Sequence, residues 1–362
     1  MAKPKYAQIV QQLREQVARM EPGDRFASEN ELVVRFGVSR PTAARALREL
    51  HTAGLVERRV GSGTFVLGTE PGGRRPARTV GVILAGLGAT EVWDPIARHV
   101  GRSASAAGVT VVVGPQESPK DDIAAVAAQA QWMLERGVDG VLFAPLENVT
   151  DRERENQLVC EQFRAAGVPV VLLDRDVVEF PGRSGFDVVG MDDVRAGAEV
   201  GRHLLERGFH EAIFLSYPNH PATTDLRSAG CRWALGRGGV QVSGEWHVSG
   251  DPTDQAWVSA VLAEHGPRAV ICANDRTAAL LIQTLNRLGQ RVPTDLAVAG
   301  FDDVVYSRLL PVALTTVAQP FDRIAEAALH RLLRRIEEPD LPAAQLLHAG
   351  RLQVRDSTRA DS

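Results

Sequence analysis

Residues 136–176 read RGVDGVLFAPLENVTDRERENQLVCEQFRAAGVPVVLLDRD, and they contain one complete strand–helix–strand unit. The apolar runs 140–143 and 168–173 are short and rich in β-branched residues, which predicts buried strands. Between them, 153–166 has the apolar spacing of a helix, and Gly167 follows it, where glycine adopts the left-handed conformation that ends a helix. Nearly continuous apolar strands joined by helices indicate a parallel sheet that is covered on both faces.

The same alternation of strand and helix recurs from residue 79 onward. The further strands expected are 79–84, 109–113, 188–191, 212–217, 269–273 and 296–301, and the further helices are 95–107, 123–136, 194–207 and 277–288. Because these strands are more than a single sheet usually contains, they favour an α/β fold with two lobes. In such folds a ligand binds beyond the carboxyl ends of the strands.

Charge divides the chain into two parts. Of the 362 residues, 44% are hydrophobic and 24% are charged, which is ordinary for a globular protein. The net charge of −4 comprises a net +6 in residues 1–78 and a net −10 in 79–362. The stretch GTEPGGRRPART at 68–79 has the composition of a linker. We therefore expect a basic domain at 1–68 that binds a polyanion, a linker at 69–78 and a large domain at 79–362.

Several classes of protein are disfavoured by the sequence. No apolar run approaches the ~20 residues that a membrane helix needs, and the N-terminus lacks the pattern of an export signal, so we expect a cytoplasmic protein that contacts no membrane. Cys160, Cys231 and Cys272 lie far apart, outside any Cys/His ligand motif, which predicts reduced thiols, no metal site and no cofactor. No phosphate-binding, nucleophile or zinc-protease motif occurs, and Lys120 is the sole lysine after Lys5, so no enzyme is expected.

The basic segment has the pattern of a winged helix-turn-helix. Helical spacing is found at 6–20, 28–36 and 40–53, and strands are expected at 55–59 and 64–67 around a glycine-rich tip. Two helices joined by a three-residue turn and followed by a hairpin are typical of this DNA-binding motif.

The third of these helices is expected to enter the major groove, with the residues at its start facing base edges. The hairpin arginines face phosphates, and the glycine tip allows close approach of the backbone to DNA. The candidate DNA-binding residues are Ser39, Arg40, Thr42, Arg45, Arg58, Arg59, Gly61, Ser62 and Gly63.

Residues 5–66 resemble the winged-helix domain of the GntR family. The elements PGDR, SENEL, VSRPT, AGLVERR and GSGTFV occur in the order and at the spacing of that family. The resemblance implies DNA contacts from Arg40 and from the wing. Asn30 and Ala44 stand where the family commonly has arginine, and Ala27 replaces a common proline, so the resemblance implies an operator that differs from the usual half-site.

Residues 79–357 resemble the effector domain of the LacI/GalR family, which is itself similar to periplasmic sugar-binding proteins. The strongest match is the segment 269–333, which begins AVICAND and includes GFDD and VAQP; the upstream match through LLDRD and LRSAG is looser. Carboxylates, amides and arginine are the groups that bind sugar hydroxyls, and an aromatic face stacks on the ring. The resemblance implies that the effector-binding residues are Trp93, Asp94, Asp174, Arg227, Asn274, Asp302 and Gln319. Asp275, beside Asn274, is interpreted as the cap of the helix that follows.

The combination of these two domains resembles AraR-type repressors. This resemblance implies a homodimeric transcriptional repressor of carbohydrate-utilisation genes, which leaves its operator when a small sugar binds between the lobes. Two alternatives stay open: a non-sugar effector such as a nucleoside or another polar metabolite, and an effector domain that no longer senses. The candidate carboxylates favour a neutral ligand over an anionic one.

Overall fold

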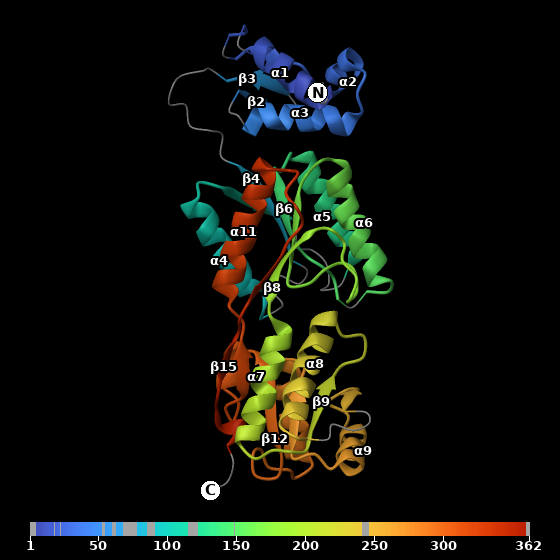
Figure 1. The fold of residues 1–362 in the computed structure, drawn as a ribbon, viewed down its shortest axis with the longest axis vertical. Helices are drawn as coiled ribbons and strands as arrows, with labels where there is room; N and C mark the ends of the chain where they lie inside the picture. The colour runs from blue at the N-terminus through green and yellow to red at the C-terminus, as the bar shows by residue number, and fades with distance from the viewer. Residues whose placement is uncertain are drawn as a thin grey trace.

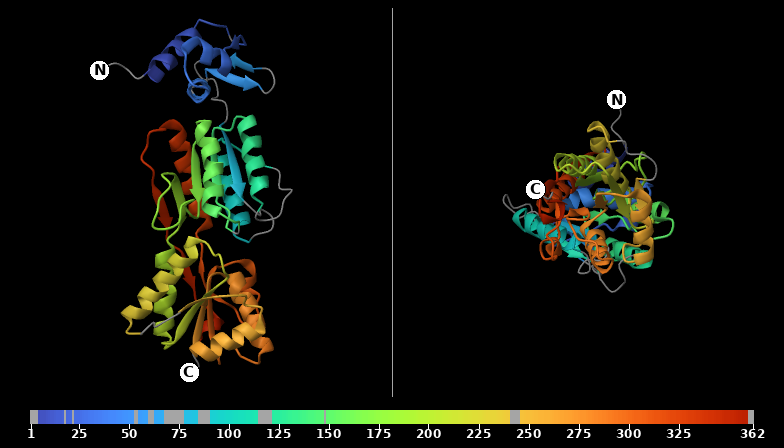
Figure 2. Two further views of the ribbon diagram at one scale, coloured as in Figure 1. Left: turned by 90° about the vertical axis from the view of Figure 1, so that its right-hand side faces the viewer. Right: turned by 90° about the horizontal axis from the view of Figure 1, so that it is seen from below.

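The computed structural model describes residues 5–17, 19–21, 23–52, 55–59, 63–67, 78–84, 91–114, 122–147, 149–240 and 246–359. It contains one small antiparallel sheet and two six-stranded sheets. These sheets define a winged-helix head, a first lobe and a second lobe, stacked end to end with the two chain termini at opposite ends (Figures 1 and 2). The α/β class and the two lobes with largely parallel sheets confirm the fold expected from the sequence.

The head consists of α1 (Lys5–Val17), β1 (Arg25–Phe26), α2 (Glu29–Phe36), α3 (Arg40–Thr52), β2 (Val56–Arg59) and β3 (Gly63–Val66). Its core contains the fully buried side chains of Leu13, Leu32 and Leu50. Ser28 caps α2 through a reciprocal capping box with Glu31. The first helix ends at Val17 and not at the expected residue 20.

The first lobe is built on a sheet of order β14-β8-β7-β6-β4-β5, in which all strands are parallel. Its elements are β4 (Thr79–Leu84), α4 (Trp93–Ala106), β5 (Thr110–Val113), α5 (Ile123–Glu135), β6 (Gly140–Ala144), α6 (Arg152–Ala165), β7 (Val170–Leu173), β8 (Asp187–Met191), α11 (Phe321–Glu337) and β14 (Gln345–His348).

The second lobe is built on a sheet of order β10-β9-β11-β12-β13-β15, in which only β15 is antiparallel. Its elements are α7 (Asp193–Glu206), β9 (Ala212–Ser216), α8 (Ala222–Arg237), β10 (His247–Ser249), α9 (Gln255–His265), β11 (Ala269–Cys272), α10 (Asp275–Arg287), β12 (Ala297–Asp302), η1 (Val305–Arg308), β13 (Thr315–Ala318), β15 (Arg351–Gln353) and η2 (Asp356–Thr358). Within the described residues, no helix is both long and apolar enough to cross a bilayer.

The chain passes between the lobes three times: after β8, between β13 and α11, and between β14 and β15. Gly350 lies in the third passage, where a Cβ atom would stand 2.5 Å from a methyl carbon of Val317 and 2.9 Å from the sulfur of Met191. The three passages are therefore in direct contact and form a common hinge region.

Glycine also lets α7 and α8 pack closely. A Cβ atom on Gly197 would lie 2.0 Å from the carbonyl oxygen of Arg227, and one on Gly230 would lie 2.0 Å from that of Val194. Because the backbones touch, this pair of helices holds Arg227 in a fixed position at the edge of the lobe.

Candidate functional site

Arg227 organises the side of the cleft that belongs to the second lobe. Its Nε donates to a carboxylate oxygen of Asp193 at 2.8 Å, and its Nη1 donates to the carbonyl oxygen of Ala273 at 2.8 Å. The same Nη1 lies 3.3 Å from Oδ1 of Asp302, which also accepts a 2.7 Å hydrogen bond from Nε2 of Gln319. The four side chains of Arg227, Asp193, Asp302 and Gln319 are all buried.

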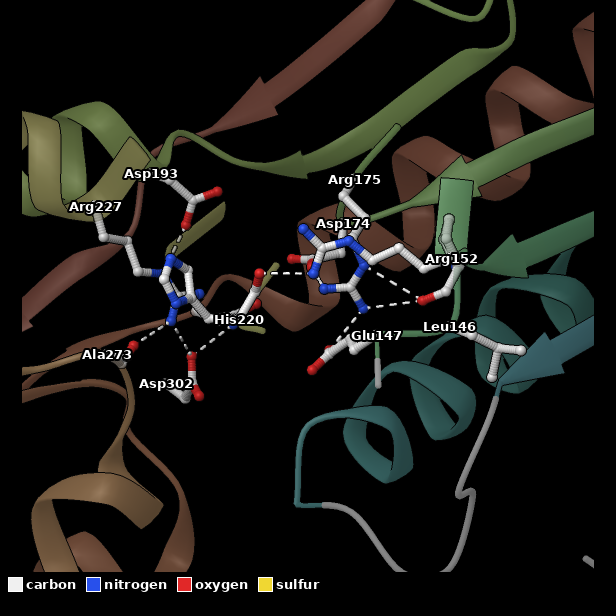
Figure 3. A network of polar contacts seen from close by, with 12 residues as sticks. Leu146, Glu147, Arg152, Asp174, Arg175, Asp193, His220, Arg227, Ala273 and Asp302 are labelled. Atoms are coloured by element: carbon white, nitrogen blue, oxygen red, sulfur yellow. Dashed lines mark hydrogen bonds and ion pairs between the residues drawn. The ribbon is translucent and has the colours of Figure 1, made fainter. Parts of the chain in front are cut away.

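Arg175 organises the opposite side, on the first lobe. Its guanidinium lies 2.6 Å from Glu147 and 3.1 Å from Asp174, and it donates to the carbonyl oxygen of Pro145. Figure 3 shows this group across the cleft from Arg227, with both guanidinium groups flanked by carboxylates. The two groups lie near the carboxyl ends of β7 and β12. The fold thus brings together segments that are about 130 residues apart in sequence.

Carboxylates outnumber guanidinium groups in this cleft: Glu147, Asp174, Asp193 and Asp302 surround Arg175 and Arg227. Burial raises the pKa of Asp302, and Arg227 opposes that shift. Burial likewise raises the pKa of Asp193 against the opposing effect of Arg227, and Asp174 adds to the increase. The cleft thus offers both hydrogen-bond acceptors and fixed donors, which are the groups that bind a polyhydroxylated ligand.

Arg152 connects the two lobes at the rim of this cleft. Its Nη1, at the start of α6 in the first lobe, donates to the carbonyl oxygens of Asn219 and His220 in the second lobe at 3.1 and 2.7 Å. Its other nitrogens donate to Glu179. A cavity of about 710 Å³ lies beside Arg152, lined by residues from both lobes that include Glu147 and Asn219, but Arg175 and Arg227 are not part of its lining.

The structure brings four of the seven effector-binding candidates, Asp174, Arg227, Asp302 and Gln319, into the cleft. Asn274 is the N-cap of α10, and its side-chain oxygen accepts from the backbone and hydroxyl of Thr277. The capping role assigned to Asp275 was therefore wrong. Asp275 is buried and accepts from the Val304 amide and the Thr316 hydroxyl, and burial raises its pKa well above the ordinary value.

Trp93 and Asp94 begin α4. The Trp93 side chain is buried in the apolar core beside Ile96, which favours a packing role over a stacking platform. Asp94 is half-buried. The effector-binding role of both residues stays a prediction.

Sequence reasoning missed Glu147, Arg152, Arg175 and Asp193 as cleft residues. Two of them had a local signal, because Arg175 adjoins Asp174 in the LLDRD segment and Asp193 begins the helix after β8. Glu147 and Arg152 lie where the sequence shows only a charged loop and helix start, so no pattern distinguished them from solvated charges.

In the head, Arg40 stands exposed at the start of α3, 3.6 Å from Glu29. Ser39 and Thr42 share a 2.8 Å hydrogen bond between their hydroxyls. Arg45, one turn further along α3, lies 3.8 Å from Asp340 of the first lobe, and His51 lies 3.8 Å from Asp139. One face of α3 is therefore turned toward the first lobe, as Figure 1 also shows.

The wing is described only in part. Gly63 begins β3 with φ +114°, a conformation that favours glycine. Arg58 and Arg59 lie in β2, opposite Thr64 and Gly63. The candidates Gly61 and Ser62, and all but Arg78 of the expected linker, fall outside the described residues.

A winged-helix head on two lobes that enclose a polar cleft defines a class of ligand-responsive DNA-binding proteins. Residues 5–66 match the family of bacterial regulatory proteins named gntR, and 202–358 match the periplasmic binding protein-like domain. The chain therefore belongs to the bacterial transcriptional regulators that join a gntR-family DNA-binding domain to a periplasmic-binding-protein-like domain.

Individual proteins show the same relationship. The arabinose metabolism transcriptional repressor of Geobacillus stearothermophilus is 25% identical over 98% of both chains. The transcriptional repressor PurR of Erwinia tasmaniensis is 30% identical over 72% of this chain and 73% of its own. A LacI-family regulator from Enterococcus faecium, solved with bound ribose, shares the fold with a TM-score of 0.63, 22% identity and coverage of 79% of this chain and 100% of its own.

Proposed function

We propose that the protein represses carbohydrate-utilisation genes and that a small, neutral sugar bound between the lobes releases it from its operator. The observation that carries this proposal is the paired arrangement of Arg227 and Arg175, each fixed among carboxylates on opposite sides of one cleft. Arginine and carboxylates in such fixed positions recognise the hydroxyls of a sugar from two sides. The full-length similarity to an arabinose metabolism repressor supports the carbohydrate class.

In this proposal residues 1–68 form the DNA-binding domain, 69–78 form the linker, and 79–362 bind the effector and form a cytoplasmic homodimer. Operator recognition uses the start of α3 and the wing. Because Arg45 faces Asp340 in the present arrangement, the head must turn away from the first lobe before α3 enters a major groove. The proposal assigns a regulatory role and no catalytic one.

The test is fluorescence anisotropy of the purified protein on DNA from its own upstream region, at fixed salt because phosphate contacts make affinity salt-dependent. A panel of pentoses, hexoses, disaccharides and nucleosides is then titrated. We expect one neutral sugar to release the DNA. Arg227→Ala removes the release and keeps DNA binding, whereas Arg232→Ala, an exposed arginine on the same helix, keeps both.

Three results would contradict parts of the proposal. Release by a nucleoside alone would replace the sugar by another polar metabolite. Tight operator binding that no compound alters would indicate an effector domain that no longer senses. A monomer in light scattering, alone or on DNA, would remove the homodimer.

A further inference from the structure

Three side chains that the cleft chemistry does not use converge beside Arg152, on the second lobe. They are His220, just before α8, Asp225 in the first turn of α8, and His247 at the start of β10. Nε2 of His220 lies 2.9 Å from Oδ1 of Asp225, and Nδ1 of His247 lies 4.0 Å from the same oxygen. These three ligand atoms all lie within 4.8 Å of one another.

In one tautomer of each ring, a nitrogen faces Asp225 with a free lone pair. Nδ1 of His220 lies 3.0 Å from the carbonyl oxygen of Tyr217 and 3.0 Å from Ser216 Oγ; in the tautomer that carries its proton on Nδ1, this nitrogen donates to the carbonyl oxygen. In that tautomer Nε2 presents a lone pair to a carboxylate oxygen of Asp225 at 2.9 Å. Two electron-rich atoms at that distance repel each other unless a proton or a metal ion lies between them.

His247 is oriented in the same manner by the Ser216 hydroxyl. Its Nε2 lies 2.9 Å from Ser216 Oγ, which is also 3.2 Å from the hydroxyl of Ser249. When Nε2 donates to Ser216 Oγ and that hydroxyl donates to Ser249, the opposite nitrogen, Nδ1, is left with its lone pair toward Asp225. Histidines that bind metals typically donate their other N–H to such an oxygen partner, which holds the ring in place.

The spacing suits a tetrahedral transition-metal ion. With bonds of ~2.0 Å to nitrogen and oxygen, two ligands of Zn²⁺ stand roughly 3.3 Å apart. The 2.9 and 4.0 Å separations from Asp225 bracket that value, and all three ligand atoms lie within 4.8 Å of one another, so side-chain adjustment can bring them around one ion.

We infer that His220, Asp225 and His247 form a site for a divalent transition-metal ion of the Zn²⁺ type, with the remaining position open to water. Sequence patterns did not reveal it, because the histidines are separated by a helix and belong to no short ligand motif. The site adjoins the interlobe contact directly, since Arg152 donates to the carbonyl oxygen of His220 itself. A bound ion therefore fixes the loop that the first lobe holds.

The inference is tested with the full-length protein after treatment with a chelator and desalting. Co²⁺ is titrated and its visible absorption is recorded, because tetrahedral and octahedral Co²⁺ differ strongly in the intensity of this absorption. Zn²⁺ is then added to displace the Co²⁺. Isothermal titration with Zn²⁺ gives the affinity, with Mg²⁺ as the hard-cation comparison. The variants are His220→Ala, His247→Ala and Asp225→Asn, and the matched control is His210→Ala, an exposed histidine of the same lobe.

We expect one Co²⁺ per chain with tetrahedral absorption, displacement by Zn²⁺, and no response to Mg²⁺. Each histidine variant should weaken Zn²⁺ binding by about 100-fold or more, and the control should match the wild type. Circular dichroism and operator binding verify that the variants fold. Absence of stoichiometric Co²⁺ binding by the wild type, or equal affinity in folded His220→Ala, His247→Ala and the control, overturns the inference.

Discussion

Replacing Arg227 by alanine tests the central ion-pair network. The guanidinium holds two buried carboxylates, Asp193 at 2.8 Å and Asp302 at 3.3 Å. Removing one partner of a buried ion pair typically costs ~3–5 kcal/mol, because the remaining charge is left in a poorly solvated place. We expect Arg227→Ala to lower the free energy of unfolding of the lobes by about that amount near neutral pH.

The loss of stability in Arg227→Ala should depend on pH, and the direction of that dependence follows from the pKa of Asp193. Burial raises the pKa of this carboxyl, and Arg227 opposes the shift, so the variant raises the pKa further. A group with a raised native pKa binds more protons in the native state than in the unfolded state, and its stability contribution decreases as pH rises toward the native pKa. The limit for one proton is ~1.4 kcal/mol per pH unit. The destabilisation should therefore be larger near about pH 8 than near about pH 5.5.

Urea unfolding monitored by tryptophan fluorescence provides the measurement. All five tryptophans lie between residues 93 and 257, so their emission reports on the lobes and not on the head. The matched control, Arg232→Ala, should stay within about 0.5 kcal/mol of the wild type. A loss below about 1 kcal/mol, or one that does not change with pH, would refute the assigned role of Arg227.

Three further substitutions address other features. Arg152→Gln removes the hydrogen bonds to the carbonyls of Asn219 and His220; the lobes should open, with a larger radius of gyration in X-ray scattering and about tenfold weaker effector binding, and an unchanged radius would contradict this. Gly230→Ala places a methyl group against the α7 backbone and should cost about 2 kcal/mol or more; wild-type stability in urea would show that the helices can separate freely. Ser28→Ala removes the α2 cap and should cost ~1 kcal/mol in the head alone, seen as faster hydrogen exchange in α2; unchanged exchange there would argue against the capping role.

The periodicity of apolar residues along the sequence predicted those helices and strands that are buried on one side. The strand at 79–84 and the glycine-terminated helices of both lobes agree with the structure, and Gly108, Gly137, Gly167 and Gly208 all have positive φ. The three cysteines are buried and unpaired, as expected.

Other elements had no such signal. The helix α8 is buried through small residues such as Gly230 on one side and carries Arg227 into a polar cleft, so its apolar residues show little helical periodicity. The edge strands β10 and β15 have only three residues each. Sequence patterns extend over only a few neighbouring residues. They therefore missed the cleft residues, whose importance depends on partners from the other lobe.

The three passages of the chain between the lobes have a consequence for synthesis on the ribosome. The head is complete at residue 66, but the first lobe still lacks α11 and β14, which are translated after the whole sheet of the second lobe except β15. Until then the apolar side chains of α4 have no cover from Ile324 and Leu329, and the edge of β8 has no partner strand. Unpaired edges of this kind promote aggregation. A nascent or truncated chain therefore has a complete winged-helix head before the first lobe can close.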